Sequence, residues 1–130
     1  TQSPSSAASD VYKRQLQVHE GPASISKRGT EALLPGMLLS NEPGYYQAGA
    51  WGIRTETLVI VTAPDDKGFS GFETVTLCPI DRDLIDADLL LPTERDWLNA
   101  YHAEVMEKLA PELAGETACL DWLTAACAPV

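Results

Sequence analysis

The sequence predicts an α+β fold in which an antiparallel sheet is followed by two helices. Up to about residue 80, apolar and β-branched residues form short runs between turn signals, which is typical of strands. After about residue 90, apolar residues recur at three- and four-residue spacing, which indicates amphipathic helices. The 130 residues, 45% hydrophobic and 22% charged, fit one small soluble domain or part of a larger one.

Residues 1–15 differ from the rest of the chain. They are rich in Ser, Ala and Gln and show no apolar period, so we expect them to be disordered or foreign to the fold. The sheet is expected over residues 16–80 and the helical region over residues 81–130.

Three strands are expected in the sheet region, each next to a turn that contains Gly or Pro: residues 37–41, 52–62 and 72–77. The pair Pro43-Gly44 is expected to end the first strand, so that a loop runs on to Trp51. A turn over residues 64–68 closes the second strand.

The first helix is expected to begin at Thr93, whose side chain would cap it with Asp96 three positions on, and to end or kink at Pro111. Its apolar stripe is Trp97, Leu98, Tyr101, Val105 and Leu109. The second helix is expected over residues 117–126, and presents Leu120, Trp122 and Leu123 for packing.

Charge and hydropathy exclude several classes of partner. A formal net charge of −10 would repel phosphate backbones, so no nucleic-acid partner is expected. The longest apolar runs, such as residues 58–61, are too short to cross a bilayer, and the N-terminus shows no secretion signal. No membrane association is therefore expected.

The three cysteines, Cys78, Cys119 and Cys127, do not have the spacing of metal ligands. Cys119 and Cys127 are eight residues apart on or beside one helix, about 12 Å at its usual rise, which is too far for a disulfide. Reduced thiols indicate a reducing compartment, so a cytoplasmic location is expected.

The candidate functional residues lie in three short polar segments, VHEGP, SNEPGYY and GIRTE. If the strands that carry the second and third segments pair antiparallel, Glu42 and Glu56 meet on one sheet face. Two carboxylates held together there require a proton or a cation between them. Arg54 shares the face of Glu56 and could orient a carboxylate, and His19 could move a proton near neutral pH.

Spacing alone leaves ordinary structural roles open for these residues. His19 could be a satisfied structural histidine, and Glu42 a surface acid beside a turn. Arg54 and Glu56 could be an exposed pair on a strand. With such structural roles, the chain could also be a self-standing small structural protein.

The runs VHEGPASIS, PGMLLSNEPGYYQAGAWGIRTETLVIV and GFETVTLCPIDRDLID, followed by DWLNAYHAEVMEKLAP, resemble the C-terminal part of aminopeptidase P. This family belongs to the pita-bread metallopeptidases, and the likeness covers nearly all of residues 16–130. It implies the C-terminal half of a pita-bread catalytic domain over residues 16–80, with a helical C-terminal extension over residues 81–130. It also implies a hydrolase that removes the N-terminal residue from peptides with proline in second position.

The resemblance implies a role for each of the four candidate residues. Glu42 matches a metal ligand that also serves as general base, and Glu56 matches the glutamate that bridges two divalent metal ions, here expected to be manganese. Arg54 matches an arginine that organises the hydrogen bonds of the metal site and the substrate. His19 matches a histidine that contacts the scissile peptide and assists proton transfer without binding metal.

The chain departs from the family pattern at the other metal ligands. The family uses two aspartates, one histidine and two glutamates, and the first three precede the VHEGP segment. Residues 8–14 contain no histidine and no glycine where the ligand histidine is expected. Three of five ligands are therefore absent, so the chain itself is expected to be inactive and to bind manganese weakly.

The implied partner is a peptide substrate with proline in second position, and the family allows a homodimer for the full-length enzyme. The alternative is a non-catalytic pita-bread module that binds a protein. The joint presence of His19, Glu42, Arg54 and Glu56 argues against this alternative, because a binding module has no need of that set. Other pita-bread enzymes are less similar in the last third of the chain.

Overall fold

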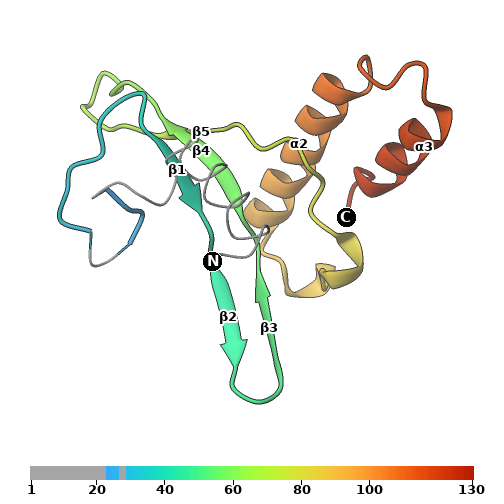
Figure 1. Cartoon of the computed structure of the whole chain (residues 1–130), viewed down its shortest axis with the longest axis horizontal. Coiled ribbons are helices and arrows are strands. Elements are labelled where there is room, and N and C mark those ends of the chain that lie inside the picture. The colour runs from blue at the N-terminus through green and yellow to red at the C-terminus, as the bar shows by residue number, and fades with distance from the viewer. Residues whose placement is uncertain (1–22, 27–28) are drawn as a thin grey trace, which may run out of the picture. The chain divides into compact units, whose positions relative to one another are not determined.

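The computed structural model describes residues 23–26 and 29–130. It divides into two compact units, one that extends to Thr76 and one that covers Leu77–Val130 (Figure 1). The first unit carries the strands and the second carries the helices, which confirms the expected α+β class. The expectations for residues 1–15 and for His19 lie outside the described residues.

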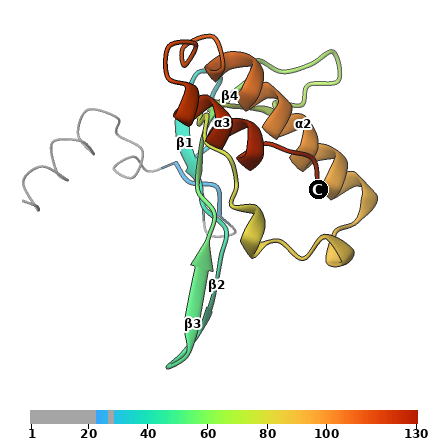
Figure 2. The same cartoon turned by 90° about the vertical axis from the view of Figure 1, so that its right-hand side faces the viewer.

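The strands of the first unit form two antiparallel sheets. The strands are β1 (Leu38–Asn41), β2 (Gly44–Gln47), β3 (Trp51–Arg54), β4 (Thr57–Val61) and β5 (Phe72–Thr74). One sheet has the order β1-β4-β5, and the other consists of β2 and β3 alone. Figures 1 and 2 show β2 and β3 as a narrow two-stranded ribbon that leads away from β1 and β4.

The two sheets share one long hairpin. Asn41 lies opposite Thr57 at the end of the first sheet, and Gly44 lies opposite Arg54 at the start of the second. The register is therefore the same on both sides of the interruption. At the tip, Gly49 adopts a φ of 73° in a short loop closed by the hydrogen bond from the Ala50 N–H to the Gln47 carbonyl.

The loop expected from Pro43 to Trp51 and the single strand expected over residues 52–62 were wrong. Residues 44–47 form strand β2, and residues 52–62 contribute to two strands separated at Thr55 and Glu56. Pro43 has no N–H and so cannot complete the ladder, although its carbonyl still accepts the Thr55 N–H at 3.2 Å. The proline therefore interrupts the hairpin without ending it.

The third strand is shorter than expected, because β5 ends at Thr74 and not near residue 77. The Leu58 N–H, which would continue the ladder, donates to the Thr76 hydroxyl at 2.7 Å. A side chain has thus replaced a backbone carbonyl at this point, and the regular strand stops.

The core of the first unit lies on one face of β1 and β4. Leu39, Val59 and Val61 are buried there, with Ala23, Leu33 and Met37 packed against them. The residues between them on β4, Leu58 and Ile60, are only half-buried. Burial thus alternates along the strand, as expected for a sheet that is covered on one face. The opposite face of the long hairpin is consequently free to carry polar side chains.

The second unit is helical, with two short 3₁₀ helices, η1 (Arg82–Leu84) and η2 (Ala87–Leu89), before α2 (Pro92–Leu109) and α3 (Thr117–Ala126). The bounds of α3 are those expected from the sequence, and α2 ends just before Pro111 as expected. The core consists of Tyr101, Val105, Leu123 and Cys127. Trp97 belongs to the expected apolar stripe but is not part of the core, because it is 54% exposed and stacks flat on Tyr101.

The expected cap of α2 was also wrong. The helix begins at Pro92, so Thr93 lies inside its first turn and Leu91 occupies the capping position. The Glu94 carboxylate accepts the Leu91 N–H at 2.9 Å. Proline is favoured at the first helical position because it lacks an N–H that the helix could not satisfy there.

The three cysteines are free thiols; Cys127 is buried, whereas Cys78 and Cys119 are exposed. Among the described residues, no helix has the length and apolar character needed to cross a membrane.

Candidate functional site

The long hairpin brings Glu42 and Glu56 together at its interruption. The register on both sides of the break places these two residues opposite each other on one face. Arg54 shares this face because it is two residues from Glu56 along the strand. The antiparallel pairing on which the sequence prediction depended is therefore confirmed.

Arg54 forms an ion pair with each glutamate. Its Nε lies 3.7 Å from Glu42 Oε2, and its second terminal nitrogen lies 3.7 Å from Glu56 Oε2. The Ser40 hydroxyl, one pair further along the same face, donates to Glu56 Oε1 at 2.9 Å. The two carboxylates thus meet around a single guanidinium group.

The site is accessible to solvent. The side chains of Glu42 and Glu56 are 34% and 38% exposed, and that of Arg54 is 51% exposed. A carboxylate pair in this setting presents several oxygen atoms to any divalent cation that approaches from solvent. Hard and borderline divalent ions such as Mn²⁺ or Mg²⁺ prefer such oxygen ligands.

The donor set fits part of a metal centre. Within residues 23–26 and 29–130, no group of three or more His, Cys, Asp or Glu side chains lies close enough to hold an ion. Glu42 and Glu56 provide oxygen ligands of the right chemistry but too few of them for a closed site. Further ligands must come from elsewhere for a metal to be held tightly.

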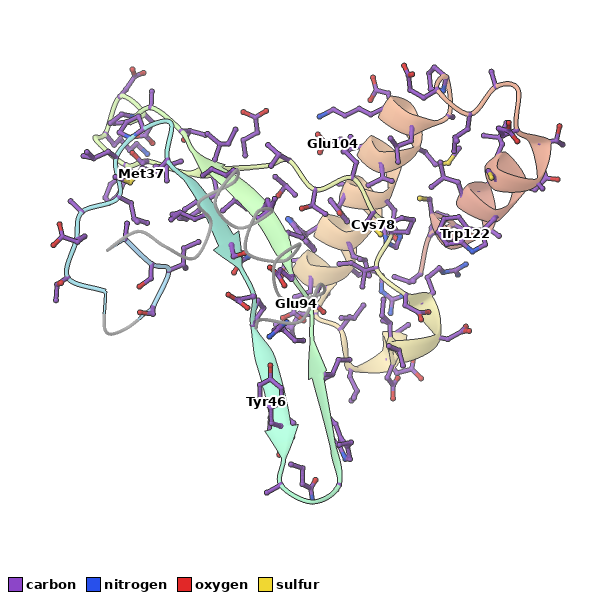
Figure 3. All side chains as sticks on the ribbon, in the orientation of Figure 1. Met37, Tyr46, Cys78, Glu94, Glu104 and Trp122 are labelled. Atoms are coloured by element: carbon purple, nitrogen blue, oxygen red, sulfur yellow. The ribbon has the colours of Figure 1, made fainter. Side chains whose placement is uncertain are left out.

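Tyr46 is a residue of this face that the sequence reasoning did not single out. Its ring lies across the two glycines of the hairpin, since a Cβ on Gly52 would come within 2.6 Å of its Cδ1 and one on Gly44 within 2.6 Å of its hydroxyl oxygen. The hydroxyl therefore lies beside Gly44, the residue that pairs with Arg54. Figure 3 labels Tyr46 on β2. In the sequence, the only sign of this contact is that Gly44 and Gly52 lie an even number of residues from Tyr46, on the same face of the hairpin.

The tyrosine and Gly52 should depend on each other for hairpin stability. Gly52→Ala is expected to weaken hydrogen-exchange protection of the β2 and β3 amides, because the new methyl group displaces the Tyr46 ring. In a Tyr46→Ala background the same substitution should cost much less, with a coupling of at least about 0.5 kcal/mol. Additive effects in the double variant would show that the ring does not pack on the glycine.

The structure places three of the four predicted site residues together. Glu42, Arg54 and Glu56 form the cluster, whereas His19 lies outside the described residues. Their assigned roles stay predictions.

Two family models match the chain. Residues 13–63 match metallopeptidase family M24, and residues 68–130 match the C-terminal region of peptidase M24. Together they cover the long hairpin and the helical unit.

Curated relatives are named as aminopeptidases P. A probable Xaa-Pro aminopeptidase P of Laccaria bicolor is 47% identical over 124 residues, which cover 88% of this chain and 19% of that relative. Aminopeptidase P2 of Arabidopsis thaliana is 50% identical over 110 residues, 78% of this chain and 16% of that protein. The chain thus spans about a fifth of the length of the curated relatives it matches.

A solved structure also resembles the chain. The X-prolyl aminopeptidase of Caenorhabditis elegans, described as a cytosolic enzyme with a di-nuclear active site, superposes with a TM-score of 0.76 at 37% identity. The match covers 87% of this chain and 20% of that one.

Proposed function

The chain belongs to metallopeptidase family M24 and corresponds to a C-terminal part of aminopeptidase P, and on that basis we propose that it carries two of the five ligands of a two-metal peptidase site. The reaction proposed is removal of the N-terminal residue from peptides with proline in second position. The meeting of Glu42 and Glu56 around Arg54 is the observation that supports it most strongly.

Glu42 and Glu56 are the residues that would hold the metals. Glu56, which also accepts the Ser40 hydroxyl, is suited to bridge two ions because its two oxygens face different partners, Ser40 and Arg54. Two divalent ions, for which we propose manganese, would supply an activated water and polarise the scissile carbonyl. Ligands outside the described residues would have to complete the set.

Glu42, Arg54 and His19 would transfer protons and orient the reacting groups. Glu42 would accept a proton as general base, since its carboxylate is partly exposed and can reach a water on the open side of the hairpin. Arg54 would keep both carboxylates aligned through its two ion pairs. His19 would contact the scissile peptide and assist proton transfer. Since only two ligands are present, the chain alone should not turn over substrate.

This proposal is tested by supplying the other metal ligands from a relative. A chimera would join the upstream part of the Laccaria bicolor relative to residues 16–130, with the relative's own C-terminal part as control. We expect manganese-dependent release of arginine from an Arg-Pro-Pro peptide by both proteins, and none by the chain alone. The assay belongs in a reducing, cytoplasm-like buffer, which matches the location we propose.

A chimera that folds, binds manganese and leaves the peptide intact would overturn the assigned activity. A chimera that folds and binds no manganese would favour the non-catalytic protein-binding alternative. Turnover by the isolated chain would show that the ligand count is wrong.

A further inference from the structure

His102 is the most completely buried ionisable side chain of the described residues. It lies on α2 with no exposed surface. Its Nε2 accepts the backbone N–H of Ile80 at 3.0 Å, so this nitrogen carries no proton and the neutral ring carries its proton on Nδ1. Nδ1 is buried too, and it has no hydrogen-bond partner among the residues that the structure describes.

The segment bound by His102 is the start of the helical unit. Tyr101, the preceding residue on α2, donates its hydroxyl to the Cys78 carbonyl at 2.8 Å and accepts the Cys78 N–H at 3.4 Å. Two adjacent α2 side chains therefore fix residues 78–80 by their backbone groups. Figure 3 marks Cys78 on this segment.

A positive charge lies close to the imidazole. Arg82 follows the fixed segment and donates to the Ala125 carbonyl and to the Pro129 carbonyl, each at 3.1 Å. These two bonds favour the present position of the guanidinium group. Burial lowers the pKa of His102 from its usual value of 6.5, and Arg82 lowers that pKa further.

The other titratable groups around the ring do not offset this charge. Tyr101, whose ring centroid is 5.9 Å from that of His102, has a pKa raised mainly by burial and so stays neutral. Burial also raises the pKa of the Cys127 thiol, on the α3 side of the same core. Among the described residues, Arg82 is the charged group that shifts the His102 pKa, in the same direction as burial.

We propose that the neutral His102 side chain holds residues 78–80 on α2, and that protonation of His102 releases them. Protonation converts Nε2 from an acceptor to a donor, so the bond from the Ile80 N–H must break and two N–H groups face each other. The new charge is also buried beside Arg82. The stability of the helical unit would thus respond to pH just below neutral.

The direction of the pH dependence follows from the lowered pKa. Well above pH 6.5 the ring is neutral in both the folded and the unfolded chain, and the full stability is present. As the pH falls below 6.5, the unfolded chain takes up a proton that the folded chain resists, so stability is lost. The equilibrium constant for unfolding should rise by up to about tenfold per pH unit, the limit for one proton.

The experiment uses urea unfolding of the full chain between pH 8 and about 5.5, above the range in which most carboxylates titrate. For the wild type, the urea concentration at the unfolding midpoint should decrease as the pH drops below 6.5. His102→Gln should remove this pH dependence, because glutamine keeps an acceptor for the Ile80 N–H but does not titrate. His19→Gln, at the only other histidine, is the matched control and should keep it. A pH dependence that persists in His102→Gln and disappears in His19→Gln would overturn the proposal.

If His102→Gln does not fold, an NMR titration of the wild-type imidazoles decides the question. His102 is expected to show the Nδ1–H tautomer, to titrate below 6.5, and to lose exchange protection of the Ile80 amide as it does so. Titration of His102 at or above its usual value, or an Ile80 amide that stays protected in the protonated form, would overturn the proposal.

Discussion

Replacing Glu42 by glutamine in the active chimera is expected to lower kcat by about 10²–10⁴-fold, the usual contribution of a general base. Glutamine preserves the size of the side chain but cannot accept the proton that the carboxylate would take. Its pairing with the Arg54 guanidinium, 3.7 Å from the Glu42 carboxylate, would also be lost. The measurement is the steady-state rate on an Arg-Pro-Pro peptide at saturating manganese.

The manganese concentration separates the two roles assigned to Glu42. If it served only as a metal ligand, excess manganese would restore much of the rate, whereas loss of a general base persists at saturation. Glu73→Gln, at an exposed glutamate of strand β5, is the matched control and should leave the rate unchanged. A Glu42→Gln chimera with the same rate as the parent would show that Glu42 takes no part in catalysis.

Truncating Leu123 is expected to produce the largest loss of stability. The side chain is 2% exposed and packs with Tyr101, Val105 and Cys127 in the core that joins α2 to α3. Leu123→Ala should therefore lower the free energy of unfolding by about 2–5 kcal/mol, through lost burial and the cavity left behind. Urea unfolding of the chain, followed by circular dichroism of the helices, measures this loss.

Trp122→Ala provides the control for this substitution. It removes a larger side chain from the same helix, but Trp122 is 62% exposed. Figure 3 labels Trp122. The expected loss is within about 0.5 kcal/mol, as for most surface positions. Equal losses in the two variants would contradict the assignment of Leu123 to the core.

The pairing of the two glutamates could be predicted because it depends on local rules. Two polar segments separated by a loop with Gly49 can pair in only a few registers, and the apolar alternation of β4 selects the face. The bounds of α3 followed from its apolar period and its flanking residues. Cation-binding chemistry then followed from two carboxylates on one face.

Other features depended on contacts that a sequence pattern does not contain. Pro43-Gly44 is a common strand breaker, yet the missing N–H of Pro43 falls at the interruption of a hairpin that continues beyond it. Trp97 has the spacing of a buried residue, but it stacks on Tyr101 from outside. A lone histidine gives no sign of burial, and only the acceptance of the Ile80 N–H identifies the state of His102.

Anomalous diffraction from crystals of the chimera soaked in manganese tests whether the two glutamates hold the metal ions. Two manganese peaks are expected at the hairpin interruption, with Glu56 contacting both and Glu42 contacting one. Peaks located away from this face, or a fully occupied metal pair that leaves both glutamates uncoordinated, would contradict this expectation.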